Sequence, residues 1–97
     1  MKAVMIIFNQ SISEMVMHIL DECTIRGFTR RADVQGRGSD RGEPHLGTHA
    51  WPSKNVAIMC MVDQEKLDAL LPQLKMLAEE ADQQGLRAFV WEAESAV

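Results

Sequence analysis

The sequence of 97 residues lacks the short motifs that identify common enzymes and metal sites. No GxSxG, HExxH, Walker A or paired-carboxylate arrangement occurs, so there is little evidence for enzyme chemistry. The two cysteines, Cys23 and Cys60, form no CxxC pair, which argues against a zinc finger or a thioredoxin-like site. Both stand among apolar neighbours, and we expect buried free thiols.

Long apolar runs and an excess of basic residues are also lacking. The apolar run near the N-terminus is only six residues long, too short for a signal peptide or a membrane span. We therefore expect a cytoplasmic protein without membrane insertion. A net charge of −4 argues against a nucleic-acid binder whose whole surface is basic. The length fits one domain, residues 1–97.

Four segments have strand-like patterns. Residues 2–8 and 56–62 are apolar at almost every position, which indicates strands buried on both faces. Residues 28–35 alternate between polar and apolar side chains, which indicates a half-exposed strand at a sheet edge. Residues 86–91 are the fourth predicted strand.

A first helix is predicted between the first two strands. Ser11 and Glu14 have the spacing of a capping box, in which each side chain bonds a free backbone N–H of the first turn. Apolar residues then recur at helical spacing up to Cys23. Gly27 is the expected end, because glycine takes the left-handed cap conformation without strain.

A second helix is predicted between the third and fourth strands. Asp63 is its expected cap and Gly85 its expected end. Pro72 either bends this helix or begins a second helical segment. The order βαββαβ describes an α+β, ferredoxin-like sandwich: a four-stranded antiparallel sheet with two helices on one face and strands one and three in the centre.

The predicted sheet carries apolar side chains on both faces, yet two helices can cover only one. A monomer would expose the other face as a larger apolar patch than single subunits usually tolerate. We therefore expect a closed homo-oligomer packed sheet face to sheet face. A dimer is the commonest closed form, and three sheets forming an inner prism would make a trimer.

Residues 36–55 form a long predicted loop between strands two and three, rich in glycine and poor in apolar residues. From Arg26 to Lys54 there are six basic and three acidic residues, a net charge of +3. The rest of the chain has four basic and eleven acidic residues. This cationic segment on an acidic body suggests an anionic ligand or an acidic partner patch, although a solvated arginine cluster would look the same.

The start of this loop is a candidate anion site. Glycines allow backbone N–H groups to form a nest, and guanidinium groups beside it suit phosphate or carboxylate. The same glycines could serve only to turn the chain. We predict that the ligand-binding residues are Gly36, Arg37, Gly38 and Arg41, completed by Lys54 or by Arg87 from a neighbouring subunit.

A second candidate site in the loop contains Glu43, His45 and His49, whose side chains can bind a divalent metal. The histidine spacing suits a helix face better than a loop, so solvated histidines are the alternative. A metal-responsive protein using these residues is therefore a second functional hypothesis. A small enzyme of the same fold is a third, because fold alone does not exclude activity.

The segment 34–42, VQGRGSDRG, is similar to the glycine-and-basic run where the effector loop begins in the P-II nitrogen-regulator-like superfamily. The element order, the length and the long loop also resemble that family. The resemblance implies a non-enzymatic signalling role in nitrogen regulation and a homotrimer that binds an adenine nucleotide in clefts between subunits. It also implies that the loop acts on a partner protein such as a transporter or a metabolic enzyme. Residues 82–87, DQQGLR, differ from the glycine-rich, basic turn of the nucleotide-binding members.

Overall fold

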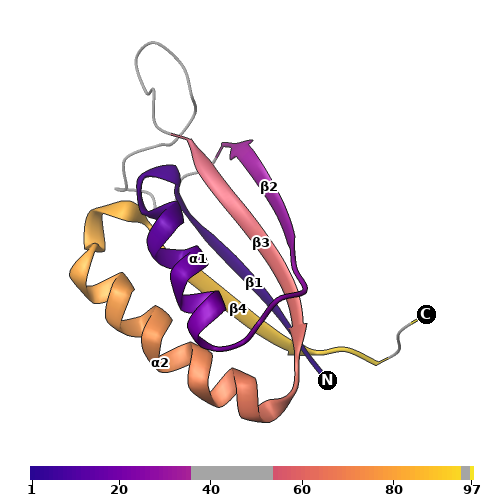
Figure 1. The fold of residues 1–97 in the computed structure, drawn as a ribbon. Coiled ribbons are helices and arrows are strands. Elements are labelled where there is room, and N and C mark those ends of the chain that lie inside the picture. Colours follow the sequence, from indigo (N-terminus) through magenta and orange to yellow (C-terminus); the bar gives the residue numbers. More distant parts are fainter. Residues whose placement is uncertain (36–53, 95–96) are drawn as a thin grey trace.

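A computed structural model describes residues 1–35, 54–94 and 97 of the chain. Its elements follow the order βαββαβ, which confirms the predicted ferredoxin-like sandwich (Figure 1). The strands are β1 (Lys2–Asn9), β2 (Thr29–Val34), β3 (Asn55–Val62) and β4 (Arg87–Glu92). The helices are α1 (Ser13–Glu22) and α2 (Gln64–Glu80), with short 3-10 helices η1 (Gln10–Ile12) and η2 (Asp82–Gln84). Neither α1 nor α2 is long and apolar enough to cross a membrane.

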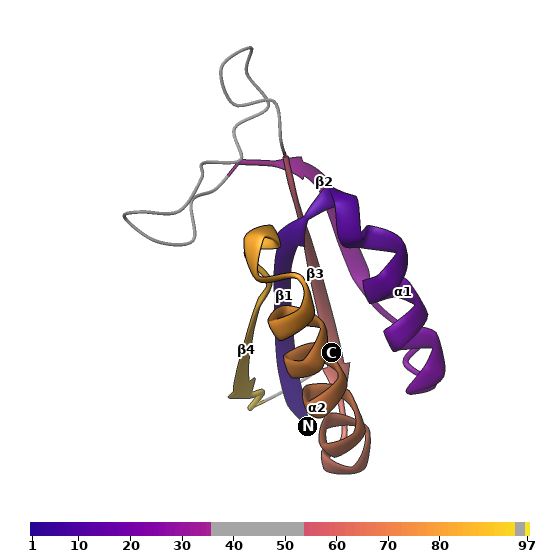
Figure 2. The same ribbon diagram turned by 90° about the vertical axis from the view of Figure 1, so that its left-hand side faces the viewer.

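The four strands pair in the order β2-β3-β1-β4, and every pairing is antiparallel. The two strands with the most apolar sequences, β1 and β3, are therefore central, as predicted. Their register places Ile6 opposite Ile58 and Phe8 opposite Val56. Both helices lie on the same face of the sheet (Figures 1 and 2).

The core lies between that face and the helices. Alternate residues of the central strands point into it because side chains alternate between the two faces of a strand. The largest side chains with almost no solvent exposure are Val4, Ile6, Phe8, Val56 and Ile58 of the sheet and Val16, Leu20, Leu70 and Leu74 of the helices.

The opposite face of the sheet, which we call the open face, is apolar and is covered by neither helix. Across its centre, Met5 of β1 stands between Met59 of β3 and Phe89 of β4. Phe89 and Trp91 remain 54% and 45% exposed, although both are large and apolar. The sequence predicts that one face of the sheet is apolar and has to be covered by another subunit. The open face matches that prediction, because its apolar side chains lie on one continuous surface.

The start of α1 differs from the predicted capping box. β1 runs directly into η1, where the Asn9 side chain accepts a hydrogen bond from the Ser11 backbone N–H at 2.9 Å. The Ser11 hydroxyl instead donates to Gln84 Oε1 at 2.8 Å. Because a 3-10 turn is inserted, the cap moves from Ser11 to Ile12 and α1 begins one residue later than predicted, with no side-chain cap at Ile12.

The predicted end of α1 at Gly27 is also wrong. The helix ends at Glu22, and Thr24 takes the left-handed conformation with φ 59°. The Thr24 N–H donates to the Asp21 carbonyl at 3.0 Å, and the Ile25 N–H donates to the Leu20 carbonyl at 2.9 Å. These two bonds form a Schellman motif, which returns the buried Ile25 to the core.

This motif gives a first prediction, because threonine is branched at Cβ and unfavourable at positive φ. We expect Thr24→Gly to raise the free energy of unfolding by roughly 1 kcal/mol in urea denaturation, since glycine takes this conformation without strain. The matched control is Thr29→Gly in β2, where glycine weakens an extended strand. Equal destabilisation by both substitutions would contradict the assignment of strain to Thr24.

The start of α2 agrees with the prediction, because Asp63 Oδ1 accepts a hydrogen bond from the Lys66 N–H at 2.9 Å. The helix continues through Pro72 as one element. Pro72 is exposed, so the carbonyl that it leaves without a helical donor can face water. Gly85, with φ 63°, follows η2 rather than α2, which already ends at Glu80.

Candidate functional site

The candidate site lies at the loop end of the sheet, which we define as the end where β1 and β2 finish and β3 and β4 begin. Gln35 and Lys54, which flank residues 36–53, stand at this end (Figure 1). Of the predicted ligand-binding residues, Lys54 and Arg87 belong to the described part of the chain. Gly36, Arg37, Gly38 and Arg41 lie outside the described residues.

Two buried asparagines anchor the loop end. Asn9 and Asn55 face each other across β1 and β3 and are the buried polar residues of the described chain. The backbone N–H of Gln10 donates to the carbonyl of Lys54 at 2.9 Å. The backbone of Lys54 is therefore held against η1, and its side chain starts from a fixed position.

The Lys54 amine lies 3.7 Å from Asp33 Oδ1, at the long end of the range for an ion pair. Both side chains are substantially exposed, so water screens this pair and its contribution to stability is small. Asp33 has a positive φ of 59° within a register shift between Arg31 and Val34. Little free energy is therefore lost when the Lys54 amine leaves Asp33 to bind a more highly charged anion.

Arg87 is the first residue of β4 and is exposed. It lies opposite Ile7, Ile7 lies opposite Ala57, and Ala57 lies opposite Arg31 of β2. These four residues form one row across the sheet, alternate with core positions, and so belong to the open face. Arg31 and Arg87 thus flank an apolar centre from the two outer edges.

Lys54 and Arg87 are not neighbours within one subunit. Strand β1 separates their strands, so two strand spacings, about 10 Å, lie between them. The Arg87 guanidinium donates to its neighbouring Leu86 carbonyl at 2.9 Å. That Arg87 from a neighbouring subunit completes the site stays a prediction.

Arg31 was not among the predicted site residues. The alternating pattern of residues 28–35 places it on the polar side of an edge strand. An arginine at such a position does not by itself indicate a binding site. Only the strand register shows that it stands level with Arg87 on the same face. Such a row is not visible in a sequence read one segment at a time.

The predicted metal ligands Glu43, His45 and His49 lie outside the described residues, so metal binding there stays a prediction. Within residues 1–35 and 54–94, no three His, Cys, Asp or Glu side chains group as metal ligands. His18 is exposed on α1, with Nε2 3.4 Å from Glu22 Oε1.

Both cysteines are buried and free, as predicted. Burial raises the pKa of the Cys60 thiol. Burial, with the nearby Glu22 carboxylate, raises the pKa of the Cys23 thiol. Since the thiolate is the reactive form, these residues are poor nucleophiles.

The described residues thus form a small sandwich with an apolar open face and a polar loop end. The family model for the nitrogen regulatory protein P-II matches residues 1–97, and the chain belongs to the P-II family. Comparison with curated proteins gives no match.

Solved structures share the fold at low sequence identity. CPII, a nitrogen regulatory PII-like protein from Thiomonas intermedia K12, bound to ADP, AMP and bicarbonate, is 21% identical with a TM-score of 0.76; the alignment covers 93% of this chain and 82% of that one. Its apo form is 18% identical with a TM-score of 0.65, covering 93% and 85%. A putative PII-like signalling protein from Thermus thermophilus is 21% identical with a TM-score of 0.59, covering 93% and 83%.

Proposed function

We propose that the protein is a cytoplasmic P-II-like regulator. It assembles as a homotrimer and binds an adenine nucleotide in the clefts between subunits. Family membership supports a regulatory rather than a catalytic role. The observation that carries the proposal is the row across the open face, with an arginine at each outer edge of an apolar centre.

The row becomes a binding site when the sheet is closed into a ring. In a cyclic trimer with inward-facing sheets, the β2 edge of one subunit meets the β4 edge of the next. Arg31 of one copy then approaches Arg87 of its neighbour, beside the loop end that carries Lys54. Several cations on one cleft suit a polyphosphate, because guanidinium groups bind phosphate oxygens in pairs.

CPII from Thiomonas intermedia K12, which has a similar fold, is bound to ADP, AMP and bicarbonate. This supports an adenine nucleotide as the effector here. We propose that Gly36, Arg37, Gly38 and Arg41 complete the phosphate contacts. Residues 36–55 then act on a partner protein, a transporter or a metabolic enzyme, according to the bound effector. Ordering of a segment by a ligand is an established switching device.

The test is an isothermal titration of ADP into the wild-type protein and into Arg87→Ala. A charge-assisted hydrogen bond contributes about 1.5–3 kcal/mol, so we expect about ten- to a hundredfold weaker binding in the variant. Lys75→Ala is the matched control, because it removes a cation from the exposed side of α2. Arg37→Ala and Arg41→Ala examine the rest of the proposed site.

Two results would count against the proposal. One is an absence of ADP binding to the wild-type protein. The other is an equal change of affinity in Arg87→Ala and Lys75→Ala, since binding would then follow net charge rather than the cleft.

A further inference from the structure

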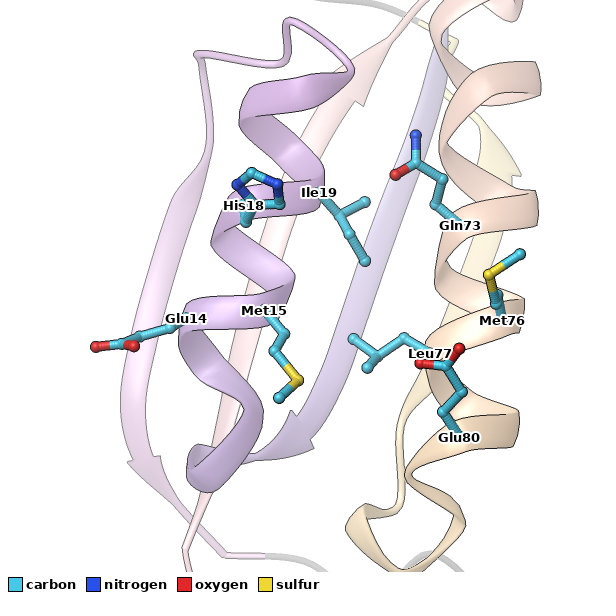
Figure 3. A pocket seen from close by; sticks show the side chains of 8 residues that line it. All are labelled: Glu14, Met15, His18, Ile19, Gln73, Met76, Leu77 and Glu80. Carbon is cyan, nitrogen blue, oxygen red and sulfur yellow. The ribbon is translucent and has the colours of Figure 1, made fainter.

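A groove runs between α1 and α2 on the side of the helices that faces away from the sheet (Figure 3). It has a volume of about 430 Å³. Each helix contributes four lining residues in two pairs spaced four apart. They are Glu14, Met15, His18 and Ile19 from α1 and Gln73, Met76, Leu77 and Glu80 from α2.

The inside of the groove is apolar. Ile19 and Leu77 are buried and form its floor, pointing toward each other from the two helices (Figure 3). Met15 and Met76 form its walls and are 55% and 61% exposed. Exposed apolar side chains are ordinary when scattered, but here they border a continuous apolar floor. Methionine is flexible and polarisable, and it is common on surfaces that accept partner helices.

The rim of the groove is acidic. Glu80 of α2 turns its carboxylate toward the groove, whereas Glu14 lines it from α1 with its carboxylate turned to the outer side of that helix (Figure 3). Among the described residues no lysine or arginine lines the groove. His18 lies close to Glu22, which adds a further carboxylate beside the rim. Helix α1 as a whole carries three carboxylates and no lysine or arginine.

We propose that this groove binds a cationic amphipathic helix of a partner protein. The apolar face of that helix lies between Met15 and Met76. Its lysines or arginines pair with Glu80, and its positive charge complements the carboxylates of α1. A cleft between two helices accommodates a third helix, whose anchors recur three and four residues apart. The acidic rim selects a basic partner and opposes an acidic one.

Charge also disfavours the helices of a second copy as the occupant. Helix α1 carries carboxylates without a lysine or arginine, and α2 carries four carboxylates against two lysines. Two such layers repel each other. The groove lies on the opposite side of the subunit from the open face, so it stays accessible when that face is covered. The proposal therefore does not depend on the nucleotide site.

The test uses the full-length protein and a fluorescein-labelled peptide of leucine and lysine, with its leucines at helical spacing. Fluorescence anisotropy should show one peptide bound per subunit. Peptides with glutamate in place of lysine, or with the same composition in scrambled order, should bind at least about tenfold more weakly.

Two double variants assign the binding to the groove. Met15→Gln with Met76→Gln should weaken binding about tenfold or more by removing the apolar walls. Glu14→Gln with Glu80→Gln should weaken it and reduce its salt dependence. Glu65→Gln with Glu94→Gln makes the same change of charge at exposed positions outside the groove and should leave the affinity nearly unchanged.

Circular dichroism checks that each variant is folded. The proposal is overturned if the scrambled or glutamate peptide binds as tightly as the designed one. It is also overturned if the methionine variant binds the peptide as the wild type does. A change in subunit assembly caused by the methionine variant alone would instead make this groove a contact between copies.

Discussion

Replacing Ile7 with glutamate is expected to convert the proposed trimer into monomers of 10.9 kDa. Ile7 is half-buried on the open face, between Ala57 and Arg87 in the row that crosses the sheet. A carboxylate buried there without a partner in each of three interfaces costs several kcal/mol per interface. Sedimentation velocity at micromolar concentration measures the change in mass.

The control is Ala69→Glu, which adds the same charge at an exposed position of α2. It should leave the proposed trimer intact. A wild-type protein that sediments as a monomer, or an Ile7→Glu variant that keeps the wild-type mass, would show that the open face does not join subunits.

The second large effect concerns the core beneath the loop end. Phe8 is fully buried near the end of β1, next to Asn9 and opposite Val56. We expect Phe8→Ala to lower the free energy of unfolding by about 3–5 kcal/mol, because it removes a large apolar side chain and leaves a cavity. Small domains have only about 5–15 kcal/mol in total, so the variant should unfold at much lower denaturant concentration.

Phe28→Ala is the matched control, because Phe28 is exposed just before β2. The free energy of unfolding should fall clearly less in Phe28→Ala than in Phe8→Ala. Urea denaturation followed by circular dichroism compares the two, and equal losses would contradict the assignment of Phe8 to the core.

The sequence predicts the strands and helices well where burial alone decides them. Residues 2–8 and 56–62 are apolar on both faces, and that property makes β1 and β3 the central strands. The alternating pattern of residues 28–35 likewise matches β2 at a sheet edge. The cap of α2 at Asp63 is also predicted correctly, from the local sequence alone.

Local signals fail where a contact from elsewhere in the chain competes with them. Ser11 leaves its predicted capping role because its hydroxyl bonds Gln84, 73 residues away. Thr24 replaces Gly27 as the end of α1 because the buried Ile25 fixes the path of the chain. Neither the contact with Gln84 nor the burial of Ile25 can be inferred from the short segment that carries the capping pattern.

The candidate site is predicted only in part, for a similar reason. Lys54 and Arg87 stand out as basic residues beside strand boundaries, but Arg31 joins them only through the register of three strand pairings. The remaining predicted ligands lie among residues 36–53, outside the described residues. Their roles rest on sequence and on the family.

The central claim is that assembly of the open face creates the nucleotide site. A calorimetric titration of ADP into the wild-type protein and into monomeric Ile7→Glu tests it most directly, with circular dichroism confirming that the variant is folded. The account predicts one ADP per subunit in the wild-type trimer and no measurable binding to the monomer. Equal affinity of trimer and monomer for ADP would contradict it.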